Sequence, residues 1–199
     1  MSLILAVKKN HQIYMASDTQ TSYDDRKINF LAEKNQKIIA LKNGILIGSS
    51  GLLHNIQLVF AHPEYFTVPS DGHLTKKHLV QVTIPCLLRL YKENNLFSKE
   101  SGGPRGTMSE NYLIAHKDRL FHINSAFSVK ELHHYGVIGS GSTLAFAALC
   151  ALDESSTQNE SEIEEGLLRA LRIASTNVMT VSGPYNLIDT TRRTSKIVG

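Results

Sequence analysis

Short hydrophobic runs separated by polar turn residues fill the first fifty positions of the chain. Residues 3–7 form one apolar run, residues 9–11 are polar, and a second run ends at Asp18. Runs of this length, bounded by turn residues, are typical of strands and too short for helices. The pattern predicts a hairpin that returns the chain so that Asp18 lies near Ser2.

Later hydrophobic patterns predict more strands, together with helices of 3.6-residue periodicity. Asn43 and Gly44 join two apolar runs, a strong hairpin signal when both turn residues adopt positive φ. Pro85 must kink or bound the second helix, and Ser161 with Glu164 has the spacing of a capping box. The predicted elements are a loop at 19–27, strands at 37–41 and 45–47, a break in the sheet at 48–51, helices at 52–60 and 79–90, a loop at 98–107, strands at 111–115, 120–123 and 135–138, helices at 143–152 and from 161 onward, and a strand at 185–188.

This order of elements predicts an α+β fold. Hairpin-linked strands imply antiparallel pairing, and helices that arrive in pairs imply that each pair covers one face of a sheet. A four-layered αββα sandwich satisfies both conditions. We expect a single domain over residues 1–199, with a frayed, mobile tail at 190–199 that includes Arg192.

Composition excludes several classes of function. The net charge is +3 with acidic and basic residues interspersed, so neither nucleic acid nor an anionic membrane is an expected partner. Cys86 and Cys150 lie in segments predicted to be helical and buried, without ligand spacing, which favours a reduced cytoplasmic setting. The longest apolar run, residues 144–152, is too short to span a bilayer, and a soluble protein is expected.

Two motifs invite a cofactor or a metal and are set aside. Gly139, Ser140 and Gly141 precede a helix, but a leucine occupies the position of the third glycine of a dinucleotide site. His133 and His134 are adjacent, so in a strand they point to opposite faces and cannot close one metal site. We expect neither a cofactor nor a metal.

Ser2 stands directly behind the initiator methionine, and this position has chemical meaning. Once Met1 is removed, the α-amine of Ser2 has an ordinary pKa of roughly 7.7 to 8, so it can accept the proton of its own hydroxyl. No histidine is then required. The alternative is that Ser2 is merely a favourable second residue and Asp18 a turn residue.

The chain resembles proteasome β-type subunits, most of all the bacterial HslV peptidases, over residues 2 to about 189. Ser2 occupies the place of the family's N-terminal threonine, and Asp18 ends the first hairpin where the family has its aspartate. Lys37 enters the next strand like the catalytic lysine. The segments Gly48–Gly51 and Gly139–Ser142 match the two glycine-serine turns that precede family helices.

The resemblance implies an N-terminal nucleophile hydrolase fold and a threonine-type endopeptidase activity, here with serine. Ser2 would attack the peptide carbonyl, Lys37 would keep the α-amine uncharged, and Asp18 would hold that lysine. The Gly51 backbone N–H would donate to the oxyanion, and Ser140 would hydrogen-bond near the amine. Three further residues match positions that line the family's substrate pocket: Thr21, Ser49 and Leu53.

The same resemblance implies stacked homo-oligomeric rings that enclose the sites, polypeptide substrates, and an ATP-driven unfoldase ring as partner. Lys34 is the alternative lysine, because it sits at the ungapped family spacing. Many proteasome subunits have an aspartate in the last helix, and the corresponding residue here is Met179, with Ser182 three positions later. HslV-like members also lack that aspartate. Two other functions remain open: a non-catalytic ring or scaffold subunit, and an N-terminal nucleophile amidase acting on a small molecule.

Overall fold

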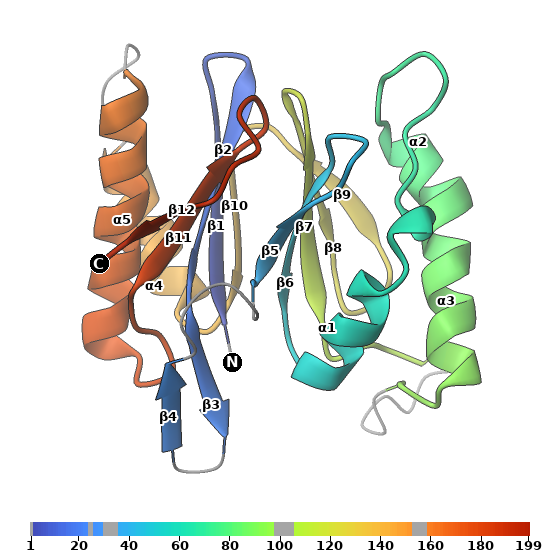
Figure 1. Cartoon of the computed structure of the whole chain (residues 1–199), viewed down its shortest axis with the longest axis horizontal. Coiled ribbons are helices and arrows are strands. Elements are labelled where there is room, and N and C mark those ends of the chain that lie inside the picture. The colour runs from blue at the N-terminus through green and yellow to red at the C-terminus, as the bar shows by residue number, and fades with distance from the viewer. Residues whose placement is uncertain (1, 24–25, 30–35, 98–105, 153–158) are drawn as a thin grey trace.

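Two antiparallel sheets lie face to face between two layers of helices (Figure 1). The computed structural model describes residues 2–23, 26–29, 36–97, 106–152 and 159–199. Within these residues, one sheet has the strand order β10-β1-β2-β11-β12 and the other has the order β5-β6-β7-β8-β9. The predicted αββα sandwich is therefore confirmed.

The elements of each layer come from separate parts of the chain. The first sheet contains β1 (Leu3–Lys9), β2 (Gln12–Asp18), β10 (Tyr135–Gly139), β11 (Tyr185–Asp189) and β12 (Lys196–Val198), and it is covered by α4 (Ser142–Leu152) and α5 (Glu160–Asn177). The second sheet contains β5 (Ile38–Ala40), β6 (Leu46–Ser50), β7 (Asn111–His116), β8 (Arg119–Ile123) and β9 (Val129–Leu132). On its outer face lie α1 (Leu53–Phe60), a 3-10 turn (Pro63–Tyr65), α2 (Lys76–His78), a π-helical turn (Leu79–Thr83) and α3 (Ile84–Glu93).

The strand β1 is buried on both faces, which explains its unbroken apolar run. Leu3, Leu5 and Val7 belong to the cluster packed beneath α4 and α5. Ile4 and Ala6 belong to the cluster between the two sheets. This alternation holds the N-terminal strand in the centre of the sandwich and so gives Ser2 a defined position.

The turn between β1 and β2 follows the prediction closely. Asn10 and His11 both have positive φ, 50° and 58°, as a two-residue turn with the twist of a hairpin requires. The next hairpin differs, because Gly44 has a φ of 89° whereas Asn43 is not left-handed. The Asn43 side chain instead donates to the Phe66 carbonyl at 2.7 Å, so the turn is tied to the segment that follows α1.

Several elements were predicted wrongly or missed. The expected loop at 19–27 includes β3 (Gln20–Tyr23), which pairs with β4 (Arg26–Asn29), and β9 was not predicted. The frayed tail is wrong for residues 196–198, because β12 pairs with β11. The sheet breaks at Gly51 and not at Gly48, since β6 continues through Ser50. Most of the expected loop at 98–107 lies outside the described residues.

The capping box of α5 lies two residues before the predicted one. The Asn159 side chain accepts from the Glu162 N–H, and the Glu162 carboxylate accepts from the Asn159 N–H. Serine and asparagine are comparable caps, and both residues have a glutamate three residues later, so the sequence pattern does not distinguish Ser161 from Asn159. Pro85 lies in the first turn of α3, directly after the π-helical turn, so it marks the predicted boundary.

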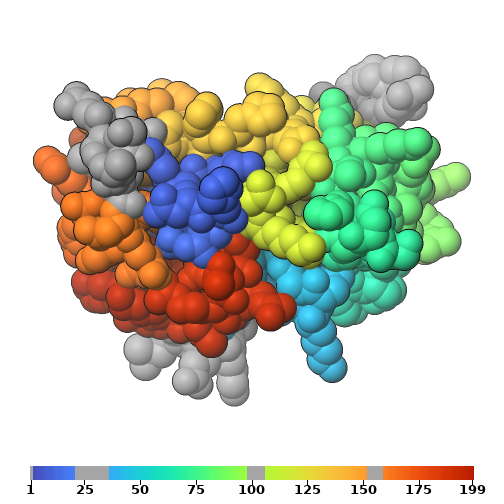
Figure 2. Space-filling model, turned by 90° about the horizontal axis from the view of Figure 1, so that it is seen from above, coloured from blue at the N-terminus to red at the C-terminus, as the bar shows by residue number. Residues whose placement is uncertain are grey.

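The two ends of the sandwich are different. At one end, shown in Figure 2, the turn of the N-terminal hairpin lies beside the segment between β11 and β12. There the Thr190 N–H donates to the Ile13 carbonyl at 3.0 Å. The chain begins at the other end, beside the hairpin of β3 and β4 (Figure 1). Among the described residues, no helix is both long and apolar enough to span a membrane.

Candidate active site

Asp18, the last residue of β2, binds two parts of the chain with one oxygen. Its Oδ1 accepts from the Leu3 N–H at 2.8 Å and from the Lys37 Nζ at 2.8 Å. The other oxygen, Oδ2, has no hydrogen-bond partner among the described residues. The hairpin therefore brings Asp18 to the start of β1, as the sequence predicted, and Lys37 joins them there.

The ion pair of Lys37 and Asp18 is almost entirely removed from solvent, with side-chain exposures of 9% and 0%. Lys37 Nζ also donates to the Gln20 carbonyl at 2.6 Å. Burial lowers the pKa of the Lys37 ammonium, although the Asp18 carboxylate opposes this change. Burial has the opposite effect on Asp18 and raises its pKa, although the Lys37 charge and the hydrogen bond from the Leu3 N–H both act to lower it. Of the two candidate lysines, Lys37 thus meets Asp18, while Lys34 lies outside the described residues.

Ser2 is buried and is held by the turn that precedes α4. Its carbonyl oxygen accepts from the Ser140 N–H at 2.8 Å. Gly139 has a φ of +97°, and a Cβ at this position would lie 1.8 Å from the Ser2 oxygen. Only glycine permits this approach, so the Gly139–Ser140 turn clamps the N-terminal strand.

The end of β6 completes the cluster. The Ser49 N–H donates to the Lys37 carbonyl at 2.9 Å. The Cβ position at Gly139 lies 3.2 Å from the Ser50 Cβ, which places the end of β6 beside Ser2 and its clamp. Gly51 follows with a φ of +143°, a backbone conformation that residues other than glycine rarely adopt. The structure thus gathers the predicted catalytic residues at one end of the sandwich.

The predicted substrate-binding residues lie on three elements around this cluster. Thr21 is on the backbone of β3, next to the Gln20 carbonyl that binds Lys37. Leu53 opens α1 and is 44% exposed. Ser49 is fully buried in this single chain, so its side chain is not presented at the surface.

Two polar groups near the Ser2 cluster, the Gln20 carbonyl and the Glu110 carboxylate, were not predicted from the sequence. The Gln20 carbonyl is a backbone group, and no side-chain pattern could have identified it. Glu110 is a fully buried acid that accepts from the Leu52 N–H, immediately after Gly51. Its only sequence signal is an acidic residue directly before an apolar strand. Met179 is 81% exposed, and its carbonyl accepts from the Gln20 side chain at 3.1 Å.

Other candidate chemistry is not assembled. Within the described residues, no group of three histidine, cysteine or acidic side chains is arranged to hold a metal ion. Cys86 is half-buried, and Cys150 is exposed on α4, so the prediction that both are buried is wrong for Cys150.

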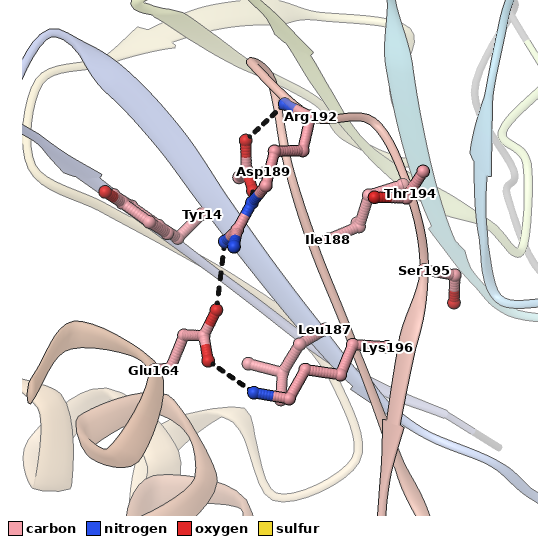
Figure 3. Close-up of a pocket in the computed structure, with 9 residues that line it drawn as sticks. All are labelled: Tyr14, Glu164, Leu187, Ile188, Asp189, Arg192, Thr194, Ser195 and Lys196. Atoms are coloured by element: carbon pink, nitrogen blue, oxygen red, sulfur yellow. Dashed lines mark hydrogen bonds and ion pairs between the residues drawn. The ribbon is translucent and has the colours of Figure 1, made fainter. Parts of the chain in front are cut away.

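A pocket of about 200 Å³ lies elsewhere, between β11, β12 and α5 (Figure 3). Its charged groups already bind one another. Arg192 contacts Asp189 and Glu164, and Lys196 contacts Glu164. Because Asp189 pairs with Tyr14 and Tyr185 pairs with Asp18, the pocket and the Ser2 cluster lie toward opposite ends of β11. We therefore place the candidate active site at Ser2 and not in this pocket.

Comparison with solved structures agrees with this fold. Thiobacillus denitrificans BPH, which has also been solved in complex with epoxomicin, matches with a TM-score of 0.72 and 19% identity over 94% of this chain and 96% of its own. Anbu, an ancestral beta-subunit from Yersinia bercovieri, matches with a TM-score of 0.70 and 15% identity over 98% and 86%. Eukaryotic HslV from Trypanosoma brucei matches with a TM-score of 0.64 and 18% identity over 94% and 98%.

These likenesses confirm the resemblance to proteasome-type subunits at the level of the fold. No family model matches the sequence. No curated protein matches it by sequence either.

Proposed function

From the fold that it shares with proteasome-like N-terminal nucleophile hydrolases, we propose that this chain is an N-terminal serine peptidase. Ser2 is the nucleophile after Met1 has been removed. One observation carries the proposal: the Asp18 carboxylate binds both the Leu3 N–H and the Lys37 ammonium, beside the residue that becomes the N-terminus. A buried ion pair is costly unless it is well satisfied, and this one adjoins a residue capable of nucleophilic chemistry.

Each residue then has a defined part in acyl transfer. The Ser2 hydroxyl attacks the peptide carbonyl, and its proton passes to the Ser2 α-amine, directly or through one water. The positive charge of Lys37 disfavours protonation of that amine and stabilises the developing negative charge on the hydroxyl oxygen. Asp18 orients Lys37, and the Gly51 N–H donates to the oxyanion. Ser140 clamps the Ser2 carbonyl, which aligns the first strand.

We further propose that the chain forms stacked homo-oligomeric rings, cleaves unfolded polypeptides, and receives them from an ATP-driven unfoldase ring. Support comes from fold likeness to HslV and to an ancestral beta-subunit. The serine at position 2 lacks the β-methyl group that restricts the rotamers of threonine, so a slower nucleophile is expected.

Intact mass spectrometry of the purified full chain, with and without epoxomicin, tests the proposal. The hydroxyl adds to the ketone of this epoxyketone and the free amine opens the epoxide, so the adduct adds the whole mass of the probe. We expect loss of Met1 and a single adduct on Ser2. Native mass spectrometry of the same sample reports the size of the assembly.

Two variants serve as controls. Ser2→Ala removes the hydroxyl and should abolish the adduct while Met1 is still removed. Lys37→Ala should greatly slow the reaction. Retained Met1 with no adduct contradicts the peptidase and favours the scaffold subunit, whereas an adduct on a monomeric protein that cleaves no peptide favours a small-molecule amidase.

A further inference from the structure

We propose that Glu110 is a positioning residue that holds the Gly51–Leu52 turn in the geometry needed for the oxyanion. This inference rests on the proposed function for its catalytic consequence. Glu110 immediately precedes β7 and is fully buried, with no ion-pair partner among the described residues. A buried carboxyl group without a cation is costly, so its hydrogen bonds identify what it does.

The two oxygens of Glu110 bind two different elements. Oε1 accepts from the Leu52 N–H at 3.2 Å, and Oε2 accepts from the Tyr91 hydroxyl at 2.5 Å. Leu52 is the residue between Gly51 and α1, while Tyr91 lies in α3. Glu110 therefore connects the turn that carries the proposed oxyanion donor to the rigid helical layer.

The backbone of Gly51 also rests directly on Glu110. A Cβ at Gly51 would lie 2.8 Å from both the Cα and the Cγ of Glu110, and 2.9 Å from the Ser109 carbonyl oxygen. The turn thus has no free space on that side. Because the Leu52 N–H is already bound to Glu110, this amide is not available to a substrate oxygen, and the proposed oxyanion donor is the Gly51 N–H.

A pair of buried phenols supports the carboxyl group from behind. The Tyr91 and Tyr112 hydroxyls lie 3.2 Å apart, and both side chains are fully buried. Burial raises the pKa of both phenols, so both stay protonated near neutral pH and can donate hydrogen bonds there. Tyr91 consequently directs its proton at Glu110, and the carboxyl group is fixed between the turn and α3.

Inactivation kinetics with epoxomicin separate positioning from general stability. Glu110→Ala removes both hydrogen bonds, and we expect the maximal inactivation rate to fall by about 10- to 100-fold, since a misplaced group costs up to about 100-fold. The half-saturating concentration of the probe should stay within about twofold of the wild-type value, because Glu110 does not contact substrate. Tyr91→Phe should give a smaller fall, because it removes only the Oε2 contact.

Glu131→Gln is the matched control. Glu131 lies in β9 of the same sheet, and its carboxylate forms an ion pair with Arg119 in the neighbouring strand β8. Two strands, β7 and β8, separate it from β6, which leads into the Gly51–Leu52 turn. The maximal inactivation rate of Glu131→Gln should equal that of the wild type. If Glu110→Ala does not fold, Glu110→Leu provides the test, because leucine fills much of the same space and accepts neither hydrogen bond.

Amide hydrogen exchange supplies a readout that does not depend on activity. The Leu52 amide should exchange roughly tenfold faster in Glu110→Ala than in the wild type or in Glu131→Gln. Unchanged Leu52 exchange, or an unchanged inactivation rate in a folded Glu110 variant, overturns the positioning role. A wild-type protein that never reacts with epoxomicin overturns instead the proposed function, and the exchange experiment still decides whether Glu110 holds the turn.

Discussion

Replacing Asp18 by asparagine should destabilise the fold strongly, because Lys37 would be left as a buried charge without its counter-ion. The side chains are 0% and 9% exposed, and the pair is 2.8 Å apart. Removing one partner of such a pair typically costs about 3–5 kcal/mol. For a domain of this size, 1 kcal/mol corresponds to about 2–4 °C, so Tm should fall by about 6–20 °C.

The structure also predicts which second change restores stability. Asp18→Asn combined with Lys37→Met removes both charges, and neutral replacements of a buried pair are often tolerated. Recovery should be incomplete by about 1–3 kcal/mol, because the Gln20 carbonyl then loses the donor that Lys37 supplied. The asparagine can still accept from the Leu3 N–H, so the start of β1 keeps its anchor.

Equilibrium denaturation of the wild type, both single variants and the double variant forms a complete thermodynamic cycle. We expect a coupling free energy of several kcal/mol between positions 18 and 37. A loss below about 1 kcal/mol in Asp18→Asn, or simple additivity in the double variant, would refute it, since exposed ion pairs behave in that way.

Three other predictions use the same protein. The rate of epoxomicin labelling should rise with pH as the α-amine loses its proton, and should then decline at a pH that is still below about 10.4, the pKa of free lysine. The decline comes this early because the lowered pKa of Lys37 means that its ammonium loses a proton at a lower pH than free lysine does. A decline that begins only above about pH 10.4 contradicts this prediction. Gly139→Ala should abolish labelling by displacing the first strand, whereas Gly166→Ala, in open space on α5, should leave labelling intact and raise stability by about 0.5–1 kcal/mol; equal labelling in both contradicts the clamp. Asn159→Ala should cost about 1 kcal/mol in denaturant unfolding, and Ser161→Ala almost nothing; the reverse order would restore the cap predicted from sequence.

Local sequence patterns predicted the secondary structure most reliably. The first hairpin, the αββα order and the helices at 52–60 and 143–152 depend on periodicity and turn residues within short windows, and they are confirmed. The errors have local causes as well. Two equivalent capping patterns two residues apart cannot be ranked without tertiary contacts, and β9 is too short and too polar to read as a strand.

The candidate site divides in the same way. The proximity of Asp18 to the start of the chain followed from the sequence, because a tight hairpin determines its own register. The choice of Lys37, the Gln20 carbonyl that binds it and the contact of Gly139 with Ser2 depend on strands from different hairpins meeting across two sheets.

By itself, then, the sequence determined the order of the helices and of most strands, the first hairpin and the presence of a nucleophilic residue at position 2. Only the tertiary structure showed how deeply the pair of Asp18 and Lys37 is buried, and that Glu110 accepts from the Leu52 N–H, 58 residues away along the chain. The physical reason is that hydrophobic periodicity encodes which face of an element is buried, whereas the partner of a buried polar group is chosen by long-range packing.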